Sequence, residues 1–126
     1  MKYQITVKGY VISISVLTIF NHYDTNSMVK NLTEIIDGFD GQPFYMLIDL
    51  SMSDGGTPEA FEQTRKFNLW LDEQNLKAKA IVCPSPLLKN INESRVRTSD
   101  KQLIKYFEDI KSAHSWFDEL SLQYVI

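Results

Sequence analysis

A continuous apolar segment, FYMLIDL at residues 44–50, limits the folds open to this chain more than any other feature of the sequence. It stays apolar up to Asp49, whereas a strand with one face in water alternates apolar and polar side chains. A run of this kind is typical of a strand that is covered on both faces. We therefore expect residues 44–50 to form the central strand of a sheet, with helices packed on its flank.

The N-terminal part of the chain predicts an antiparallel hairpin. Residues Tyr3 to Val7 alternate apolar and polar side chains, and Val11 to Ile19 is rich in β-branched residues. Gly9 lies between the two runs, where a tight turn would need a glycine. The hairpin is followed by a helix within residues 24–41, for which Thr25 or Asn26 is the expected N-cap and Gly38 the expected end.

Strands and helices then alternate. After the central strand, Thr57 and Pro58 predict a helix start, with a hydroxyl at the N-cap and proline in the first turn. The segment AKAIVC, residues 78–83, predicts a second buried strand, and a short helix around Leu88 should follow it. Residues 102–120 fit either one long helix or a strand followed by a helix. We favour strand then helix, because Asp109 can cap the second part.

The expected fold is therefore α/β, in the order β-β-α-β-α-β-α-β-α. It is a single mixed β-sheet opened by an antiparallel hairpin, with about five strands and four helices. With 126 residues and no linker or repeat in the sequence, we expect one domain over residues 1–126.

Charge and cysteine content narrow the functional class. The formal net charge of -3 predicts no binding to nucleic acid, which favours a clustered basic excess. Cys83 is the single cysteine, so no internal disulfide can form, and we expect it to pack as a small core residue. The longest apolar-rich run, YVISISVLTIF at residues 10–20, is too short and too polar to span a bilayer. These features predict a cytoplasmic protein with no integral membrane segment.

The sequence shows no set of residues for catalysis or metal binding. His22, expected in the loop before the first helix, and His114, expected at the surface, lack other ligands at suitable spacing. The glycine pair in SDGGTP has neither the lysine of a Walker motif nor the spacing of a dinucleotide fingerprint. We therefore expect no enzyme activity, no metal and no cofactor.

The order of elements, with LIDLS leaving the central strand just before a helix, resembles the STAS domain superfamily. It is most similar to the divergent bacterial SpoIIAA-like branch, which the closing pattern YFEDIKSAHSWFDEL also resembles. The resemblance implies a non-enzymatic regulatory module, like the anti-sigma-factor antagonists that bind a partner kinase beside the helix after the central strand. Asp49, Leu50 and Ser51 match the Asp-Leu-Ser that ends the strand in those proteins. The Asp-Ser-Ser-Gly that should follow is absent, and Thr57-Pro58-Glu59-Ala60 stands there, so no phosphorylated serine is carried over.

The segment between the central strand and its helix is the predicted partner-binding surface. In open α/β sheets, ligands and partners bind beyond the carboxyl ends of the strands. The first turn of the helix also offers free N–H groups that would suit an anion. A plainer interpretation is that Asp54 and Thr57 cap a helix and the serines fill a turn. The candidate residues are Asp49, Ser51, Ser53, Asp54, Gly55, Gly56, Thr57 and Glu59.

Two functions remain open from the sequence. The first is a regulatory module that binds an unknown protein partner. The alternative is a small-ligand or lipid-binding domain with an apolar cavity beneath the helices, in the style of the CRAL-TRIO fold. A pocket of several hundred Å³ would favour the alternative. A homodimer is also possible, because the tail SLQYVI carries Leu122, Tyr124 and Ile126, more apolar surface than a free terminus needs.

Overall fold

The computed structural model describes residues 2–97 and 101–124, with side chains up to Ser121. The elements, in chain order, are β1 (Tyr3–Lys8), β2 (Val11–Val16), β3 (Thr18–Phe20), α1 (His22–Gly38), β4 (Phe44–Asp49), β5 (Ser53–Gly56), α2 (Pro58–Leu71), β6 (Leu76–Val82), α3 (Pro86–Ile91), the π-helical turn η1 (Asn92–Val96), β7 (Ile104–Phe107) and α4 (Ile110–Tyr124). The tail residues Val125 and Ile126 and the side chains of Leu122 and Tyr124, on which the homodimer prediction rests, lie outside this description.

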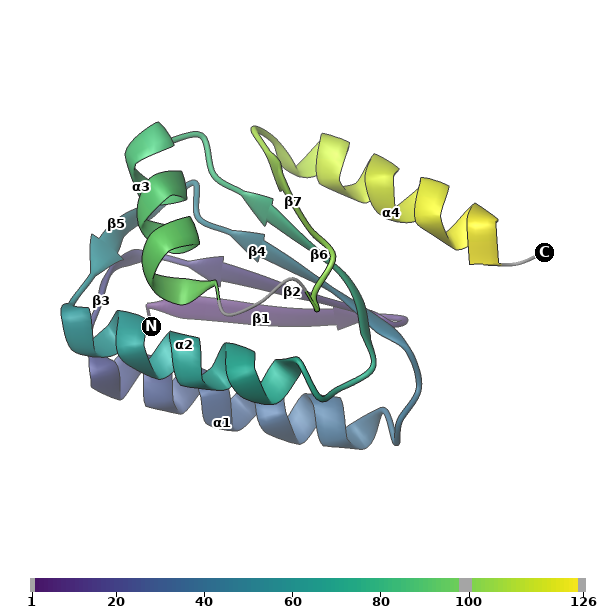
Figure 1. Ribbon diagram of the computed structural model, residues 1–126, viewed down its shortest axis with the longest axis horizontal. Coiled ribbons are helices and arrows are strands. Elements are labelled where there is room, and N and C mark those ends of the chain that lie inside the picture. The colour runs from purple at the N-terminus through teal and green to yellow at the C-terminus, as the bar shows by residue number, and fades with distance from the viewer. Residues whose placement is uncertain (1, 98–100, 125–126) are drawn as a thin grey trace.

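The predicted mixed sheet is confirmed. Its five strands lie in the order β1-β2-β4-β6-β7, with β1 and β2 antiparallel and the other neighbouring pairs parallel. β4 is the central strand, as its apolar sequence predicts. Since parallel strands end at the same edge, the carboxyl ends of β2, β4, β6 and β7 all meet at one edge of the sheet, which Figure 1 shows at the upper left.

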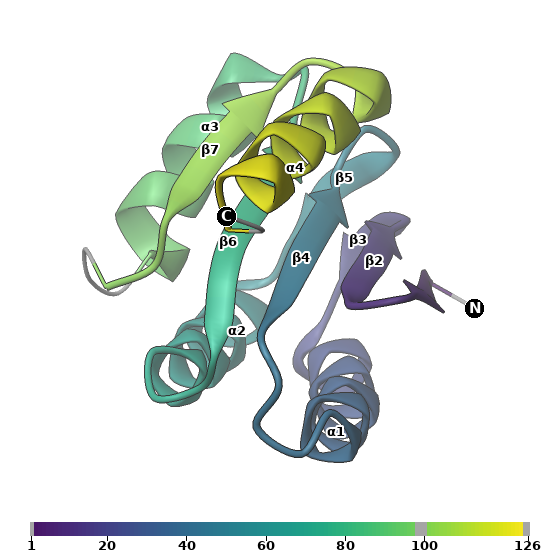
Figure 2. The same ribbon diagram turned by 90° about the vertical axis from the view of Figure 1, so that its right-hand side faces the viewer.

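Helices cover both faces of the sheet. Figures 1 and 2 show α1, α2 and α3 on one face and α4 alone on the other. Alternate side chains of β4 enter the two layers: Phe44 and Met46 pack with α1 and α2, and Leu47 packs against α4. β6 presents Ala78, Ala80 and Val82 to α4. These small side chains leave room for the helix to approach the strand closely.

The predicted extent of the second strand was wrong. The expected strand from Val11 to Ile19 is interrupted because Thr18 has a left-handed backbone, with φ of 54°. The chain leaves the main sheet there, and the Thr18 N–H donates to Met52 O at 3.0 Å. Residues Thr18–Phe20 form β3, which pairs with β5 in a separate two-stranded sheet.

Helix α1 begins earlier than predicted. Asn21, rather than Thr25 or Asn26, is the N-cap, because its side chain accepts from the Asp24 N–H while the Asp24 carboxylate accepts from the Asn21 N–H, both at 2.9 Å. His22 is therefore the first helical residue and does not lie in a loop. The helix ends at Gly38, but the left-handed turn comes two residues later, at Asp40.

In the C-terminal half, the structure agrees more closely with the predicted elements. Residues 104–107 form a strand and residues 110–124 a helix, which confirms strand then helix over one long helix. The Asp109 carboxylate accepts from the Ser112 N–H at 2.7 Å, as expected of a cap. The predicted short helix forms at Pro86–Ile91 and continues into η1.

The buried position of β4 predicts a large cost for truncating its side chains. Met46→Ala and Leu47→Ala should each lower the free energy of unfolding by about 2–5 kcal/mol, because each leaves a cavity in one of the two cores. Val7→Ala on β1, where the side chain is about half exposed, is the matched control and should cost much less. Urea unfolding measures all three. A cost for Met46→Ala or Leu47→Ala no larger than the control's would contradict the two-sided burial of β4.

Candidate functional site

The chain leaves the sheet at the end of β4 through a short turn. The Leu50 N–H still donates to Val82 O of β6, at 2.8 Å. Two local hydrogen bonds then hold the turn. The Asp49 carboxylate accepts from the Ser51 N–H at 3.0 Å, and the Ser53 N–H donates to Leu50 O at 3.1 Å. These bonds fix the turn and leave the Ser51 side chain exposed.

The segment after this turn is a strand, where the sequence predicted an open break. β5 runs parallel to β3, with Thr18 opposite Ser53 and Phe20 opposite Gly56. The register shifts between these pairs, and the exposed Asp54 falls at the shift. The Thr57 N–H then donates to Phe20 O at 2.8 Å, which joins the start of α2 to the end of β3.

The structure explains why glycine occupies both positions 55 and 56 of β5. Gly55 has φ of 105°, which L side chains rarely adopt. A Cβ on Gly56 would lie 3.2 Å from the backbone oxygen of Phe20, tighter than nearly all real Cβ contacts. The glycine pair therefore allows β5 to adopt its backbone conformation and lie close against β3.

Helix α2 begins as predicted. Thr57 is the N-cap, its Oγ1 accepts from the Ala60 N–H at 3.2 Å, and Pro58 opens the first turn. Pro58 has no N–H, and the N–H of Ala60 is already bonded to Thr57. Two of the first three helical residues therefore offer no N–H to a ligand. The helix start thus offers fewer free N–H groups to an anion than the sequence indicates, and Thr57 caps the helix. Asp54, the other expected cap, lies in β5 instead.

The structure brings the predicted residues together along one continuous segment from β4 to α2. Ser51, Asp54 and Glu59 are exposed. The half-buried members are Asp49, Ser53, Gly55, Gly56 and Thr57.

Sequence reasoning missed three exposed apolar side chains beside this segment. Ile19, Met52 and Leu87, which we call the apolar rim, are 55%, 69% and 70% exposed. Ile19 lies opposite Gly55 in the small sheet, Met52 precedes β5, and Leu87 is next to Leu88, which lies 3.8 Å from the Cβ position of Gly55. The pairing of β3 with β5 places Ile19 beside this segment, and no local pattern in the sequence indicates that pairing.

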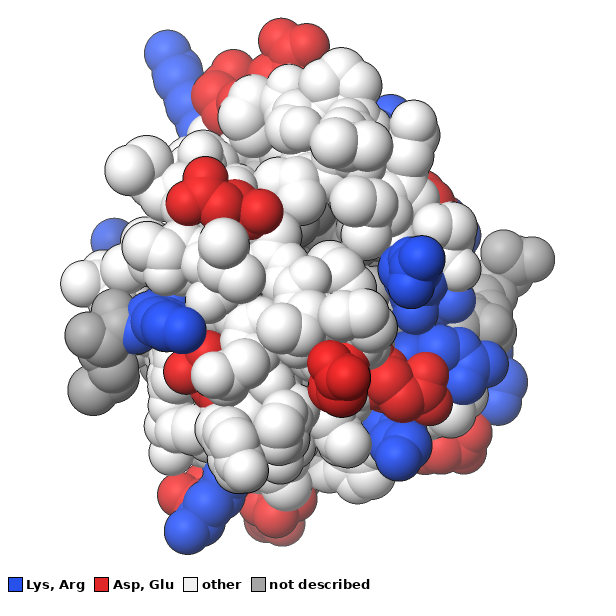
Figure 3. Space-filling view, turned by 90° about the vertical axis from the view of Figure 1, so that its left-hand side faces the viewer, with Lys and Arg blue, Asp and Glu red and all other residues white. Residues whose placement is uncertain are grey.

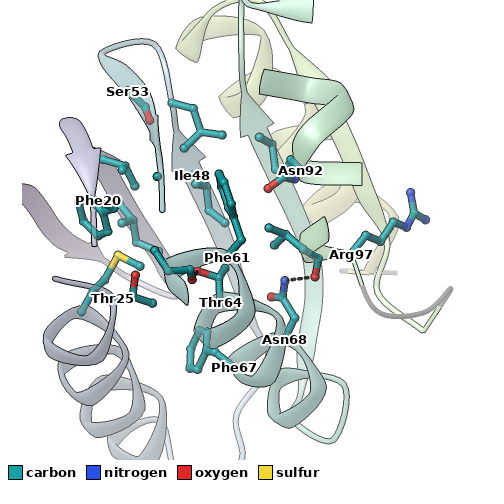
Figure 4. Close-up of a pocket in the computed structure, with 18 of the residues that line it drawn as sticks. Phe20, Thr25, Ile48, Ser53, Phe61, Thr64, Phe67, Asn68, Asn92 and Arg97 are labelled. Carbon is teal, nitrogen blue, oxygen red and sulfur yellow. Dashed lines mark hydrogen bonds between the residues drawn. The ribbon is translucent and has the colours of Figure 1, made fainter. Parts of the chain in front are cut away.

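An apolar cavity lies beneath the same segment, between the sheet and helices α1, α2 and α3. Its volume is about 120 Å³, which is smaller than the several hundred Å³ of a typical ligand pocket. Figure 4 shows Phe20, Ile48 and Phe61 around it. Ser53, Gly55 and Gly56 also line it, so β5 is both a wall of the cavity and part of the outer surface.

A second, wider depression of about 770 Å³ lies on the outside of the molecule, over the edge strand β1 and helix α1. Its lining mixes polar and apolar side chains, namely Tyr3, Gln4, Ile5, Thr6, Asn31, Glu34 and Ile35. Because it is an open depression on the outer surface, it is not the cavity beneath the helices that the lipid-binding alternative requires.

A buried lysine lies at the cavity. Lys79 of β6 is 2% exposed, and its ammonium donates to Asn68 Oδ1 at 2.9 Å. The Asn68 amide donates in turn to Val96 O at 2.9 Å, the bond drawn in Figure 4. Burial lowers the pKa of Lys79 to about 7, since the attraction of Asp72 only partly offsets the desolvation and Arg97 adds repulsion.

Gln102 completes this buried polar cluster. Its Nε2 donates to the backbone oxygen of Asn68 at 3.1 Å and to the Asp72 carboxylate at 2.8 Å. Its Oε1 is buried and accepts no hydrogen bond from any residue that the structure describes.

The cysteine and the two histidines are not among the residues that line the cavity. Cys83 is buried, as expected, and burial raises the pKa of its thiol. His114 is exposed on α4, as predicted, and the centre of the His22 ring lies 4.0 Å from that of the Tyr23 ring, with the two rings tilted by 37°. Within residues 2–97 and 101–124, no three metal-ligating side chains come together, and no helix is both long and apolar enough to cross a membrane.

Comparison with known proteins assigns the fold. No protein-family model and no curated protein matches the sequence. Among solved structures, an uncharacterised DUF3478-family protein with a SpoIIAA-like fold from Shewanella loihica PV-4 matches with a TM-score of 0.68 and 21% identity over 90% of each chain. The anti-sigma factor antagonist SpoIIAA in its unphosphorylated form matches with a TM-score of 0.63 and 11% identity, over 92% of this chain and 97% of that one.

This chain has the STAS/SpoIIAA-like fold. The resemblance seen in the sequence is thus confirmed at the level of the fold. At 21% and 11% sequence identity, the similarity to these two structures is a similarity of backbone fold.

The cap at Thr57 gives a local prediction. Thr57→Ala removes the acceptor for the Ala60 N–H and should lower the free energy of unfolding by about 0.5–2 kcal/mol. Thr57→Ser keeps the hydroxyl and is the matched control, with a smaller loss. Chemical denaturation of the three proteins checks this. Equal stability of all three would show that the cap contributes nothing.

The buried amine of Lys79 gives a pH dependence. Between pH 7 and the ordinary lysine pKa of 10.5, the unfolded chain holds a proton that the folded chain has lost. The stability of the parent relative to Lys79→Met should therefore rise with pH from about 7 to 10, by at most about 1.4 kcal/mol per pH unit. Below pH 7 the difference should level off.

Urea unfolding of both proteins from pH 5.5 to 9.5 measures this difference. Lys77→Met, at an exposed lysine on the same strand, is the control and should show no such slope. A parent-minus-variant difference that is flat above pH 7, or that falls, would show that Lys79 stays charged in the fold.

Proposed function

We propose that this chain is a non-enzymatic regulatory module that binds a protein partner, with the apolar rim at the centre of the interface. The observation that carries the proposal is the exposure of Ile19, Met52 and Leu87 around β5, at the edge where the parallel strands end. Adjacent exposed apolar side chains of this size mark interaction sites more often than isolated ones do.

The chemistry of the surrounding surface fits such an interface. Protein interfaces have an apolar centre and a polar, solvated margin. Ser51, Asp54 and Glu59 are exposed and polar and belong to the segment that borders the rim. Figure 3 shows the corresponding face of the molecule: residues other than Lys, Arg, Asp and Glu cover most of its middle, and the largest gathering of charged side chains lies to one side.

The fold supports a regulatory role over a catalytic one. One structural neighbour of this chain is named as an anti-sigma factor antagonist, a name that describes a regulatory protein. The segment proposed here lies beyond the central strand, where binding sites of open α/β sheets occur. The Thr57 hydroxyl accepts the N–H of Ala60, so its role in the described structure is that of a helix cap.

Site-specific crosslinking tests this proposal directly. A photoreactive amino acid is placed at position 52 or 87 in the source cells, and at position 10 as the control, because Tyr10 is also exposed but lies at the opposite end of β2. We expect positions 52 and 87 to capture the same protein and position 10 not to capture it.

The captured partner then permits a binding measurement. Met52→Asp and Leu87→Asp should each weaken its affinity about tenfold or more, since each places a charge in an apolar contact, while Tyr10→Asp should leave it unchanged. Full affinity in both rim variants, or capture of that protein from position 10 alone, would move the interface elsewhere.

A further inference from the structure

The cavity beneath β5 and α2 has an apolar body and a cationic group in its wall. Most of its lining is hydrocarbon or aromatic, from Phe20, Met28, Ile48, Phe61 and Ile81. Lys79 also lines it, and its ammonium is the buried cation described above. Such a combination is expected of a site for a molecule with an apolar body and an anionic head.

The other polar side chains of the lining are already engaged. Thr25 Oγ1 donates to Asn21 O at 3.1 Å, and Thr64 Oγ1 donates to Ala60 O at 2.9 Å. The Asn92 amide donates to the Tyr106 hydroxyl at 2.9 Å. Each of these three side chains donates a hydrogen bond within the protein, and Ser53 Oγ accepts from the Gly55 N–H at 3.1 Å.

The Lys79 ammonium has more hydrogen-bond donors than it uses. An ammonium has three N–H donors, and in the described part of the chain the Lys79 ammonium makes one hydrogen bond, to Asn68 Oδ1. Leaving donors of a buried charge unsatisfied is costly. An acceptor with a negative charge would satisfy the donors and compensate the charge together, whereas a neutral hydrocarbon would do neither.

The surrounding charges leave room for an anion. Asp72, on α2, attracts the ammonium, and its carboxylate also accepts from Gln102 Nε2 at 2.8 Å. Arg97, from the segment after η1, repels it, and the Arg97 guanidinium points away from the cavity in Figure 4, toward its ion pair with Glu93 at 3.2 Å. The desolvation of the ammonium outweighs the attraction of Asp72, which lowers the pKa of Lys79.

The volume limits the size of the ligand. About 120 Å³ is close to the roughly 150 Å³ of an engineered apolar cavity that binds benzene. One six-membered ring or a short branched chain fills such a space, and a long acyl chain does not. A phosphate head is excluded on different grounds, because an apolar wall cannot replace the hydration of a dianion.

We propose that this cavity binds a small apolar carboxylate, with one aromatic ring or a short branched chain, whose carboxylate accepts hydrogen bonds from the Lys79 ammonium. The apolar body lies against Ile48 and Phe61. This site is independent of the partner surface, and its test does not require the partner.

Calorimetry with benzoate and 4-methylpentanoate as probes, and benzamide as the neutral isostere of benzoate, tests the site. The parent should bind benzoate about tenfold or more tighter than benzamide. Lys79→Met should lose at least that factor for benzoate and now prefer benzamide. Lys77→Met, an exposed lysine on the same strand, should behave like the parent.

A proton count gives a second readout that does not depend on a variant. At pH 8, above the lowered pKa of Lys79, benzoate should bind with uptake of close to one proton, because the carboxylate stabilises the ammonium. The uptake is obtained from binding heats in buffers with different ionisation enthalpies. It should disappear at pH 5.5, where the amine is already protonated, and benzamide should show none at either pH.

The proposal is overturned by any of three results. One is no binding of either carboxylate by the folded parent at millimolar concentration. The second is equal benzoate affinity in the parent and Lys79→Met, which would place binding outside the cavity. The third is benzoate binding at pH 8 without proton uptake. Methyl NMR of the parent adds the location: the Ile48 methyl resonances should shift with benzoate, and those of the exposed Val7 should not.

Discussion

The two-sided burial of β4 is the constraint on which the rest of the structure depends. β4 is paired on both edges, by β2 and β6, and its side chains enter two separate cores. A strand enclosed in this way can present new side chains to solvent only where it ends. The chain therefore leaves the sheet at Leu50, and the segment that follows must return to the α1 and α2 face within a few residues.

The return path creates the features that carry the functional proposals. β5 lies against β3 because two glycines allow its backbone conformation and its close approach, and this pairing places Ile19 opposite Gly55 at the surface, while Met52 directly precedes β5. The inner side of the same strand closes the cavity that Lys79 lines. One short strand thus separates the proposed partner surface from the proposed ligand site.

Local patterns in the sequence were enough for most of the architecture. The central strand and two helix starts were predicted from short-range signals. These are the apolar run that begins at Phe44, the Thr57 hydroxyl followed by Pro58, and the Asp109 carboxylate. Each acts on neighbours a few residues away, and the predicted elements are present. The α1 start was wrong for an equally local reason, since Asn21 and Asp24 form a better cap than Thr25. The β3–β5 pairing joins residues more than thirty positions apart through backbone groups, which no residue pattern encodes. Lys79 was also beyond local reasoning, because the Asn68 that accepts a hydrogen bond from its ammonium lies on a different element.

The central claim is that the edge where β4 ends is the interaction surface of this protein. Methyl-resolved NMR during titration with the captured partner tests it most directly, because isoleucine, leucine, methionine and valine methyls report from every face of the molecule. We predict that the largest changes fall on Ile19, Met52 and Leu87, with Val7 on the edge strand and Leu120 of α4 unchanged. Changes concentrated at Val7 or Leu120, with the apolar rim unaffected, would contradict it.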